Sequence, residues 1–374
     1  MDNTLLYNDA LHLLQQMIAT PSFSRQEQQV AELITQFLQQ RQVAVQRLAN
    51  NVYAYNLHFD AAKPSLLLNS HHDTVKPNPG YTRNPFEATI ADGKLYGLGS
   101  NDAGGCLVSL IAAFLHFYQR PGLPVNIILA ATAEEEISGT QGVELLLPHL
   151  PPIHGAMVGE PTLLQMAVAE RGLMVLDAVA PGVAGHAARN EGVNALYNAL
   201  EDIEKIRTFN WHKISPLLGP SRATVTVIET QNKQHNVVPA TCSFVVDVRL
   251  NELYSFEEAV SSLQAGLKST LTPRSMRLRS TLIPAEHPLV QAGLQLGSTC
   301  YGSPTTSDKA LMPFAAFKLG PADSAGSHTA DEFIYLHEIE QGIATYIMLI
   351  ENYMTRMQDA PAATYQTSQY ETLG

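Results

Sequence analysis

The sequence predicts an α/β protein in which a small α+β unit is inserted into a larger unit with a mixed, mostly parallel sheet. Three observations lead to this fold class. Short apolar runs alternate with helical patterns in the first part of the chain, longer strand-like runs occupy the middle, and the α/β alternation returns near the end. The length of 374 residues also exceeds what one ordinary hydrophobic core supports.

The first part of the chain predicts two helices and then strands that alternate with helices. Ser24 and Glu27 have the S-x-x-E spacing of a capping box, and apolar residues at helical spacing follow, so the second helix is expected to begin there. Strands that alternate with helices favour parallel pairing. The strand-like runs and the apolar helix that follow are VAVQRL, NVYAYNL, PSLLLNS, GGCLVSLIAAFLHFY and PVNIILAAT.

The middle of the chain has the order strand, helix, strand, strand, helix. Its strand-like runs are RGLMVLDAVAPG, RATVTVIET and ATCSFVVDVRL. Helical patterns lie near residues 193–208 and 255–270, and the second begins with another capping box, Ser255 and Glu258. This order is typical of a split-βαβ, or ferredoxin-like, sandwich.

The pattern of the first part returns after about residue 280, with the strand-like run FAAFKLG and the long helical run LHEIEQGIATYIMLIENYMTR. We therefore expect residues 1–166 and 280–374 to form the larger unit and residues 167–279 to form the inserted one. The final stretch, QDAPAATYQTSQYETLG, has no periodicity and is expected to be a tail.

Composition and charge argue against several classes of function. A net charge of −12 disfavours nucleic acid or an anionic membrane as the main partner. No apolar run is long enough for a transmembrane helix, and the N-terminus MDNTLLYNDALHLLQQ lacks the basic region of a signal peptide. The three cysteines, Cys106, Cys242 and Cys300, form no CxxC pair. We expect a cytoplasmic protein with reduced cysteines in its core.

Ionisable residues follow the apolar strands of the larger unit, where the carboxyl ends of parallel strands meet at one edge of the sheet. Alone, each such residue is more often a solvated loop residue, a charged helix start or an N-cap. Together, crowded carboxylates require a cation, and their number exceeds the ligands of one tetrahedral zinc ion. Two metal ions that share a bridging carboxylate are therefore predicted. The ionisable residues at these strand ends and in the Gly-rich turn are His71, His72, Asp73, Asp102, Glu134, Glu135, Glu136, Glu160 and His328.

These motifs resemble those of the di-zinc metallopeptidases and deacylases that include acetylornithine deacetylase, succinyl-diaminopimelate desuccinylase and carboxypeptidase G. The resemblance covers nearly the whole chain, and it implies a zinc-dependent exopeptidase-like fold for the larger unit. Each motif alone is weak, but together they are specific. The matching stretches are His71-His72-Asp73 for H-x-D, Gly99-Ser100-Asn101-Asp102 for G-x-x-D, TAEEEISG for the glutamate pair, Gly159-Glu160-Pro161-Thr162 for G-E-P-T, and the last histidine, His328.

The resemblance implies a role for each of these residues and two Zn²⁺ ions per chain, with Co²⁺ as a substitute. His71 and Glu160 would hold one ion, and Glu136 and His328 the other. Asp102 would bridge the two ions. Glu135 would be the general base, and Asp73 would orient the His71 ring. His72 would be the intervening residue on the other side of the strand, where it packs or donates a hydrogen bond.

The inserted unit resembles the lid and dimerisation domain of the same family, so a homodimer through this unit is expected. In dimeric relatives the histidine that matches His186 reaches the partner's active site and stabilises the oxyanion. Asn236 and Arg249 would bind the carboxylate of the substrate. Without the resemblance, Arg249 is better interpreted as a surface ion pair and His186 as a loop residue.

Two departures from the family pattern leave the substrate subgroup open. No lysine follows soon after Asp102, and no proline lies a few residues after His186. The resemblance implies metal-dependent hydrolysis of the amide of a small N-acyl amino acid, and it is closest to acetylornithine deacetylase of arginine biosynthesis. The alternatives are an N-succinyl amino acid desuccinylase of the diaminopimelate, ornithine or citrulline type, a dipeptidase or aminoacylase, and a non-catalytic binding protein. The last is disfavoured because every ligand and the base are present.

Overall fold

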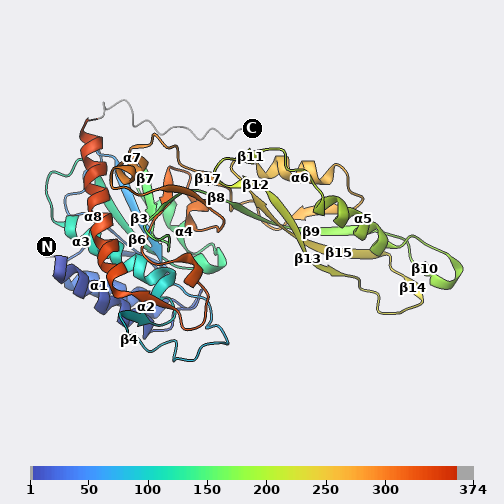
Figure 1. The fold of residues 1–374 in the computed structure, drawn as a ribbon, viewed down its shortest axis with the longest axis horizontal. Helices are drawn as coiled ribbons and strands as arrows, with labels where there is room; N and C mark the ends of the chain where they lie inside the picture. Colours follow the sequence, from blue (N-terminus) through green and yellow to red (C-terminus); the bar gives the residue numbers. More distant parts are fainter. Residues whose placement is uncertain (1–2, 360–374) are drawn as a thin grey trace.

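The computed structural model describes residues 3–359, so the expected tail lies outside the described residues from position 360 on. The molecule is elongated, and its two largest sheets, one of nine strands and one of four, lie in separate parts (Figure 1). The chain passes from the first sheet to the second between Glu170 and Gly172, and it returns between Pro273 and Thr281. The division into units at residues 166 and 279 stays a prediction.

The large sheet has the strand order β1-β2-β6-β3-β7-β19-β8-β17, with β18 beside β8. Its middle strands β6, β3, β7 and β19 are parallel, whereas β2 and β8 run antiparallel to their inner neighbours. This confirms the predicted fold class for the larger part. The strands are β1 (Val45–Leu48), β2 (Asn51–Tyr55), β3 (Ser65–His71), β6 (Asn126–Thr132), β7 (Gly155–Val158), β8 (Met166–Glu170), β17 (Thr281–Leu282), β18 (Cys300–Ser303) and β19 (Ala316–Lys318).

Helices cover both faces of the middle strands, which explains their continuous apolar runs. Leu66 and Leu68 of β3 face a core with the long helices, whereas Leu67 faces a second core on the side of α4. All seven residues of β3 are buried, including the polar ones at its end. The helices of this part are α1 (Asn3–Ile18), α2 (Gln28–Gln40), α3 (Gly105–Tyr118), α4 (Val143–Leu146), α7 (Pro288–Gln295) and α8 (Leu336–Asp359).

The predicted capping box at the second helix is wrong. The helix α2 begins at Gln28, because Arg25 has a left-handed backbone (φ 71°) that no helix can include. The Glu27 carboxylate accepts a hydrogen bond from the Arg25 amide instead of closing a box. The Ser24 hydroxyl donates to Asp73 at 2.7 Å, so it serves a different part of the molecule.

The four-stranded sheet is antiparallel and has the order β13-β15-β9-β16, which is the ferredoxin-like arrangement that the sequence predicted. Helices α5 and α6 pack against one face. The Ser255 hydroxyl accepts from the Glu258 amide at 3.0 Å, which confirms the serine half of the predicted capping box, while the Glu258 carboxylate pairs with Lys213. The elements are β9 (Gly172–Pro181), α5 (Ala195–Arg207), β13 (Arg222–Glu229), β15 (Thr241–Leu250), α6 (Phe256–Gln264) and β16 (Thr270–Pro273).

Short elements complete the described chain. Within residues 3–359, no helix combines the length and the apolarity that crossing a membrane needs. Cys106, Cys242 and Cys300 are free thiols. The short strands are β4 (Thr89–Ala91), β5 (Lys94–Tyr96), β10 (Gly185–His186), β11 (Ile214–Ser215), β12 (Gly219–Pro220), β14 (Val237–Val238) and β20 (Phe333–Tyr335). The short helical turns are η1 (Ser100–Gly104), η2 (Glu135–Ile137), η3 (Leu147–His149), η4 (Ala187–Arg189), η5 (Asp308–Leu311) and η6 (Ser324–Gly326).

Candidate metal centre

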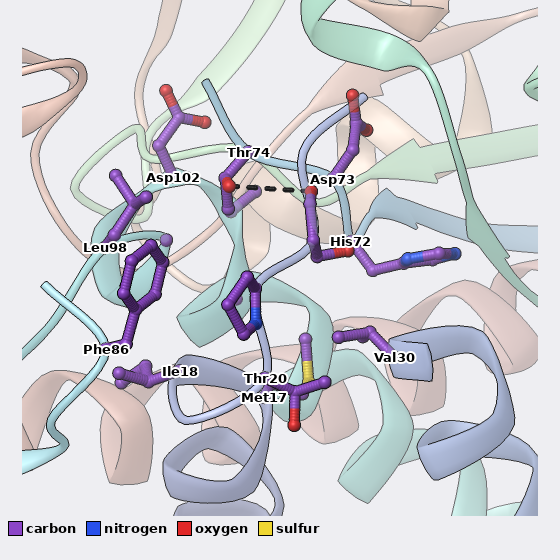
Figure 2. Close-up of a pocket in the computed structure, with 15 residues that line it drawn as sticks. Met17, Ile18, Thr20, Val30, His72, Asp73, Thr74, Phe86, Leu98 and Asp102 are labelled. Carbon is purple, nitrogen blue, oxygen red and sulfur yellow. Dashed lines mark hydrogen bonds between the residues drawn. The ribbon is translucent and has the colours of Figure 1, made fainter. Parts of the chain in front are cut away.

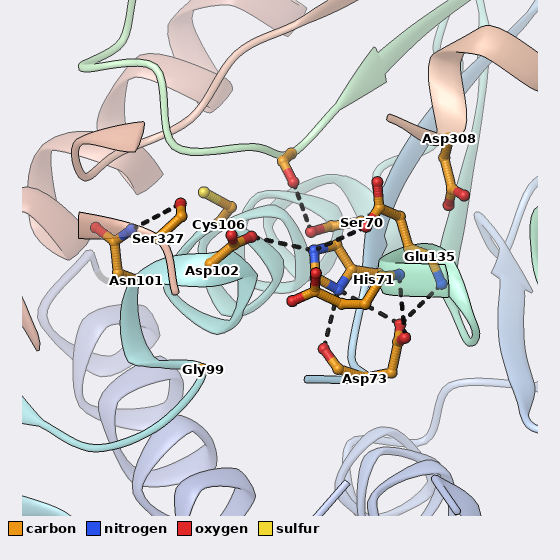
Figure 3. Close-up of polar contacts among 12 residues, drawn as sticks. Ser70, His71, Asp73, Gly99, Asn101, Asp102, Cys106, Glu135, Asp308 and Ser327 are labelled. Carbon is orange, nitrogen blue, oxygen red and sulfur yellow. Dashed lines mark hydrogen bonds and ion pairs between the residues drawn. The ribbon is translucent and has the colours of Figure 1, made fainter. Parts of the chain in front are cut away.

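The carboxyl ends of the parallel strands bring the predicted ligands together. His71 is the last residue of β3, Glu135 and Glu136 open the turn after β6, and Glu160 follows β7. The strand β3 lies between β6 and β7 in register, so these three ends meet at one edge of the sheet. Asp102, on the turn η1 before α3, points toward His71 from the side (Figure 3).

The Asp102 carboxylate faces one histidine with each of its oxygens. Its Oδ1 lies 3.3 Å from His71 Nε2, and its Oδ2 lies 3.6 Å from His328 Nε2. His328 Nε2 also lies 2.9 Å from Glu136 Oε2. A carboxylate that presents one oxygen to each of two imidazoles has the geometry that bridging of two cations requires.

A second group of possible ligand atoms also includes His71. One ligand atom each from His71, Glu135 and Glu160 lie within 4.8 Å of one another, as do one each from His71, Asp102 and Glu136. Glu160 Oε1 is buried and has no hydrogen-bond partner among the described residues. Imidazole and carboxylate donors suit zinc, and a buried carboxylate oxygen without a partner fits a ligand to a cation. The residues therefore fit a pair of divalent metal ions, while the role of each residue stays a prediction.

Asp73 supports both His71 and the segment that carries the glutamates. Its carboxylate lies 3.5 Å from His71 Nδ1 and accepts the backbone amides of Glu135 at 3.0 Å and Glu136 at 3.2 Å. The Ser24 hydroxyl donates to it as well. One buried carboxylate therefore holds the backbone of the predicted base, whereas the nearer acceptor to His71 Nδ1 is the Asp73 backbone oxygen at 3.0 Å, and the orienting role of Asp73 stays a prediction (Figure 3).

His72 lies on the other side of the strand from this cluster. Its ring Nε2 lies 2.9 Å from the Asn50 carbonyl oxygen, and its side chain points away from that of Asp73 (Figure 2). Burial lowers the pKa of His72, so this ring is neutral at neutral pH. The alternation of side chains along the strand therefore separates the two adjacent histidines, as predicted.

A cavity of about 20 Å³ lies behind the cluster, between α1, α2 and the segment that follows β3 (Figure 2). Met17, Ile18, Val30 and Phe86 give it apolar walls. This volume suits about one water molecule and not an acyl amino acid. This cavity is therefore too small to be the substrate site.

The cluster concentrates negative charge in a buried place. Burial raises the pKa of Glu160 to about 8 and that of Asp308 to about 7, and nearby carboxylates add to both shifts. Burial also raises the pKa of Glu135 well above its usual value. Burial lowers the pKa of His71, but Glu135, Asp102 and Asp73 outweigh this effect and raise it well above its usual value. A divalent cation would relieve this repulsion.

The metal-free chain is expected to lose stability as the pH rises from about 5 to about 9. The folded chain holds protons on Glu160 and Asp308, and on His328, whose hydrogen bond to Glu136 raises its pKa to about 9. The unfolded chain releases those protons at lower pH, so stability falls with rising pH. Urea denaturation of the chelator-treated protein at several pH values measures this trend, and zinc should flatten it. A metal-free chain whose stability rises over this range would contradict the charge imbalance described above.

Three predicted residues lie away from the cluster. His186 is exposed in β10, which pairs with β14 at the end of the small sheet farthest from the large one (Figure 1). The Asn236 carbonyl accepts from the Ala187 amide at 3.0 Å, so Asn236 and His186 are neighbours. Arg249 lies in β15 and pairs with Asp247, with Nε at 2.8 Å from Oδ1. Within one chain, the structure does not bring these side chains to the metal centre.

Three supporting residues were not predicted: Ser24, Asp308 and Glu332. Asp308 is buried and accepts a hydrogen bond from the Thr132 hydroxyl at 2.8 Å, directly beyond Glu135 (Figure 3). Glu332 is buried beside the turn that carries Asp102. The stretches TTSDK and TADEF look like ordinary polar loops, so the sequence carries no signal for their burial.

Solved structures with this fold include metallopeptidases and peptidases. A metallo-carboxypeptidase of the M20 family from Sulfolobus solfataricus has a TM-score of 0.71 at 17% identity, over 92% of this chain and 99% of that one. An M20 protein from Bacillus subtilis, described as a dinuclear metal-binding peptidase, has a TM-score of 0.72 at 13% identity, over 96% of this chain and 100% of that one. These similarities establish the fold.

The family model described as peptidase family M20/M25/M40 matches residues 67–352, and the chain belongs to this family. It is a hydrolytic enzyme. A succinyl-diaminopimelate desuccinylase from Cereibacter sphaeroides is 27% identical over 82% of this chain and 84% of its own length. One from Delftia acidovorans is 25% identical over 88% of this chain and 94% of its own length.

Proposed function

We propose that the protein hydrolyses the amide bond of a small N-acyl amino acid with two zinc ions, and that an N-succinyl amino acid of the diaminopimelate type is its first candidate substrate. The similarity to desuccinylases over more than four-fifths of the chain supports this substrate. These relatives favour the predicted alternative over the acetylornithine deacetylase and the arginine pathway that the sequence placed first. The location in the cytoplasm stays a prediction.

The single observation that carries the chemistry is the Asp102 carboxylate between His71 and His328. In this proposal Asp102 would contribute to both ions, His71 and Glu160 would hold one, and Glu136 and His328 would hold the other. When bound, such ions polarise an amide carbonyl and acidify water.

Glu135 would move the protons of the reaction. Its side chain is largely buried beside His71 Nε2 at 3.9 Å, and Asp73 accepts its backbone amide. This fixed backbone holds the carboxylate where it can take a proton from the attacking water and deliver it to the leaving amine. A general base placed on a rigid turn needs little reorganisation between the two steps.

The small sheet would serve as a lid and as the surface of a homodimer. Apolar side chains of this sheet, of α5 and of the segment between β9 and α5 are exposed, and a partner copy would cover them and bring His186 to the metal centre. Arg249 would have to divide its guanidinium between Asp247 and a substrate carboxylate, and Asn236 lies beside His186. Light scattering measures the mass in solution. The exposed side chains are Val179, Val183, Val193, Tyr197, Leu200, Val227 and Ile228.

A kinetic screen after metal removal tests the proposed reaction. The chelator-treated enzyme should be inactive, and zinc should restore hydrolysis of N-succinyl-diaminopimelate. The panel adds N-succinyl and N-acetyl forms of ornithine and citrulline, and a set of dipeptides. N-succinyl-diaminopimelate should have the highest kcat/KM. A pocket that pairs the succinyl carboxylate would leave its own polar groups unpaired when an acetyl group binds instead.

The outcomes of the screen separate the alternatives. A higher kcat/KM for N-acetylornithine would restore the acetylornithine deacetylase interpretation, and one for dipeptides would favour a dipeptidase. Full activity in the chelated chain would overturn the metal-dependent mechanism itself.

A further inference from the structure

We infer that Glu332 is a positioning residue for the metal centre: its buried carboxylate holds the backbone turn that presents Asp102, and it thereby sets the distance between the two metal positions. This inference rests on the proposed function, because it assigns Glu332 a role only if Asp102 binds metal. Among the described residues, the Glu332 carboxylate forms its hydrogen bonds with backbone amides and not with a predicted ligand side chain.

The contacts of Glu332 are confined to the backbone of this turn. Its Oε2 accepts the Gly99 amide at 3.0 Å, and its Oε1 accepts the amides of Asn101 at 2.8 Å and Asp102 at 2.9 Å. The side chain is buried, with 2% of the residue's surface exposed. Three short hydrogen bonds from backbone donors to one buried carboxylate leave this turn little freedom.

The turn needs such an acceptor because its backbone is irregular. Gly99 has a left-handed φ of 76°, and Asp102 has φ −118° and ψ 100°, which is not helical. The amides before α3 therefore point together into one concave site instead of extending the helix. Glu332 fills this site, which fixes the direction in which the Asp102 side chain leaves the backbone.

The same segment also delivers His328. His328 and Glu332 lie four positions apart, so one segment contacts Asp102 twice. His328 faces the Asp102 carboxylate, and Glu332 accepts the Asp102 backbone amide. Asp331 lies between them and binds a different loop, because its Oδ1 accepts the amides of Thr82 and Arg83, each at 2.9 Å. A shift of Glu332 would therefore move Asp102 and His328 relative to each other, whereas a shift of Asp331 would move the Thr82 loop.

The variant Glu332→Gln tests this role. A glutamine keeps the size and one oxygen, but its NH₂ group would face at least one of the three backbone donors. Asp331→Asn is the matched control, because it makes the same charge change in the next residue, on a carboxylate that also accepts backbone amides. Zinc binding to each metal-free chain is measured by competition with a chromophoric chelator, and native mass spectrometry counts the ions.

Glu332→Gln is expected to bind at least one of the two zinc ions roughly 10- to 100-fold more weakly than the parent chain. Asp331→Asn should keep both affinities within about twofold. At saturating zinc, Glu332→Gln should recover part of its kcat, because the ligands and the base remain. Two zinc ions bound with the parent affinity would overturn the role of Glu332 while the proposed function stands.

A second variant covers the case in which Glu332→Gln does not fold. Glu332→Asp keeps the charge but is one methylene shorter, so it cannot reach all three amides. Its zinc affinity should lie between those of the parent and Glu332→Gln, and parent-like affinity would equally overturn the inference. If the parent chain itself binds no zinc, the proposed function fails. This result differs from parent-like zinc affinity in either Glu332 variant, which would overturn only the role of Glu332.

Discussion

Glu135→Gln is expected to lower kcat by about 10²–10⁴-fold, because it removes the group that would move protons in both steps of the hydrolysis. Zinc content should stay that of the parent chain, since the predicted ligands His71, Asp102, Glu136, Glu160 and His328 remain. Steady-state kinetics on the best substrate of the screen, together with metal analysis of the same sample, measure both quantities. The melting temperature should change little, because the backbone amide of residue 135 still donates to Asp73.

Glu134→Gln is the matched control for this variant. Glu134 lies one position earlier, and its carboxylate accepts the Gln141 amide at 3.3 Å, away from the metal positions. A glutamine can still accept there, so kcat should stay within about tenfold of the parent. If Glu134→Gln lowered kcat more than Glu135→Gln does, the assignment of Glu135 as the general base would be wrong.

His71→Ala is expected to lose zinc and all measurable turnover, whereas His72→Ala should keep two zinc ions and lose stability. His71 faces Asp102, but His72 is buried on the opposite side, with its Nε2 at 2.9 Å from the Asn50 carbonyl. Removal of that ring leaves the partly buried Asn50 carbonyl without this partner and creates a cavity, which costs about 1–3 kcal/mol of unfolding free energy.

Metal analysis and urea denaturation of both histidine variants measure these effects. The two variants delete the same side chain at adjacent positions, so each is the control for the other. If His72→Ala lost zinc while His71→Ala kept it, the register of the strand end would be shifted by one residue.

The sequence could predict the centre of the site because its geometry follows from strand ends. The runs LLLNS, IILAAT and GAMVG are apolar enough to be buried parallel strands, and parallel strands end at one edge. His71, the glutamates after β6 and Glu160 therefore had to converge. The alternation of side chains likewise separates His71 from His72 without any knowledge of the tertiary structure.

The support of the site could not be predicted, because it depends on contacts between segments far apart in the chain. Ser24 fits a capping box by its spacing, yet its hydroxyl binds Asp73, 49 positions later. Glu332 binds a turn more than 200 positions earlier. Local sequence patterns report on contacts between residues close in the chain, and they carry no information on which distant amide needs a hydrogen-bond acceptor.

The place of β19 in the large sheet has a consequence for the order in which the protein can assemble during translation. This strand lies between β7 and β8, although both are synthesised long before it. Until Ala316–Lys318 leaves the ribosome, β7 has an unpaired edge that can pair with other chains, whereas β8 can already pair with β17 and β18. His328 emerges later still, so the nascent chain closes its sheet before it completes the metal centre. Ribosome stalling ahead of β19 would release chains that lack both.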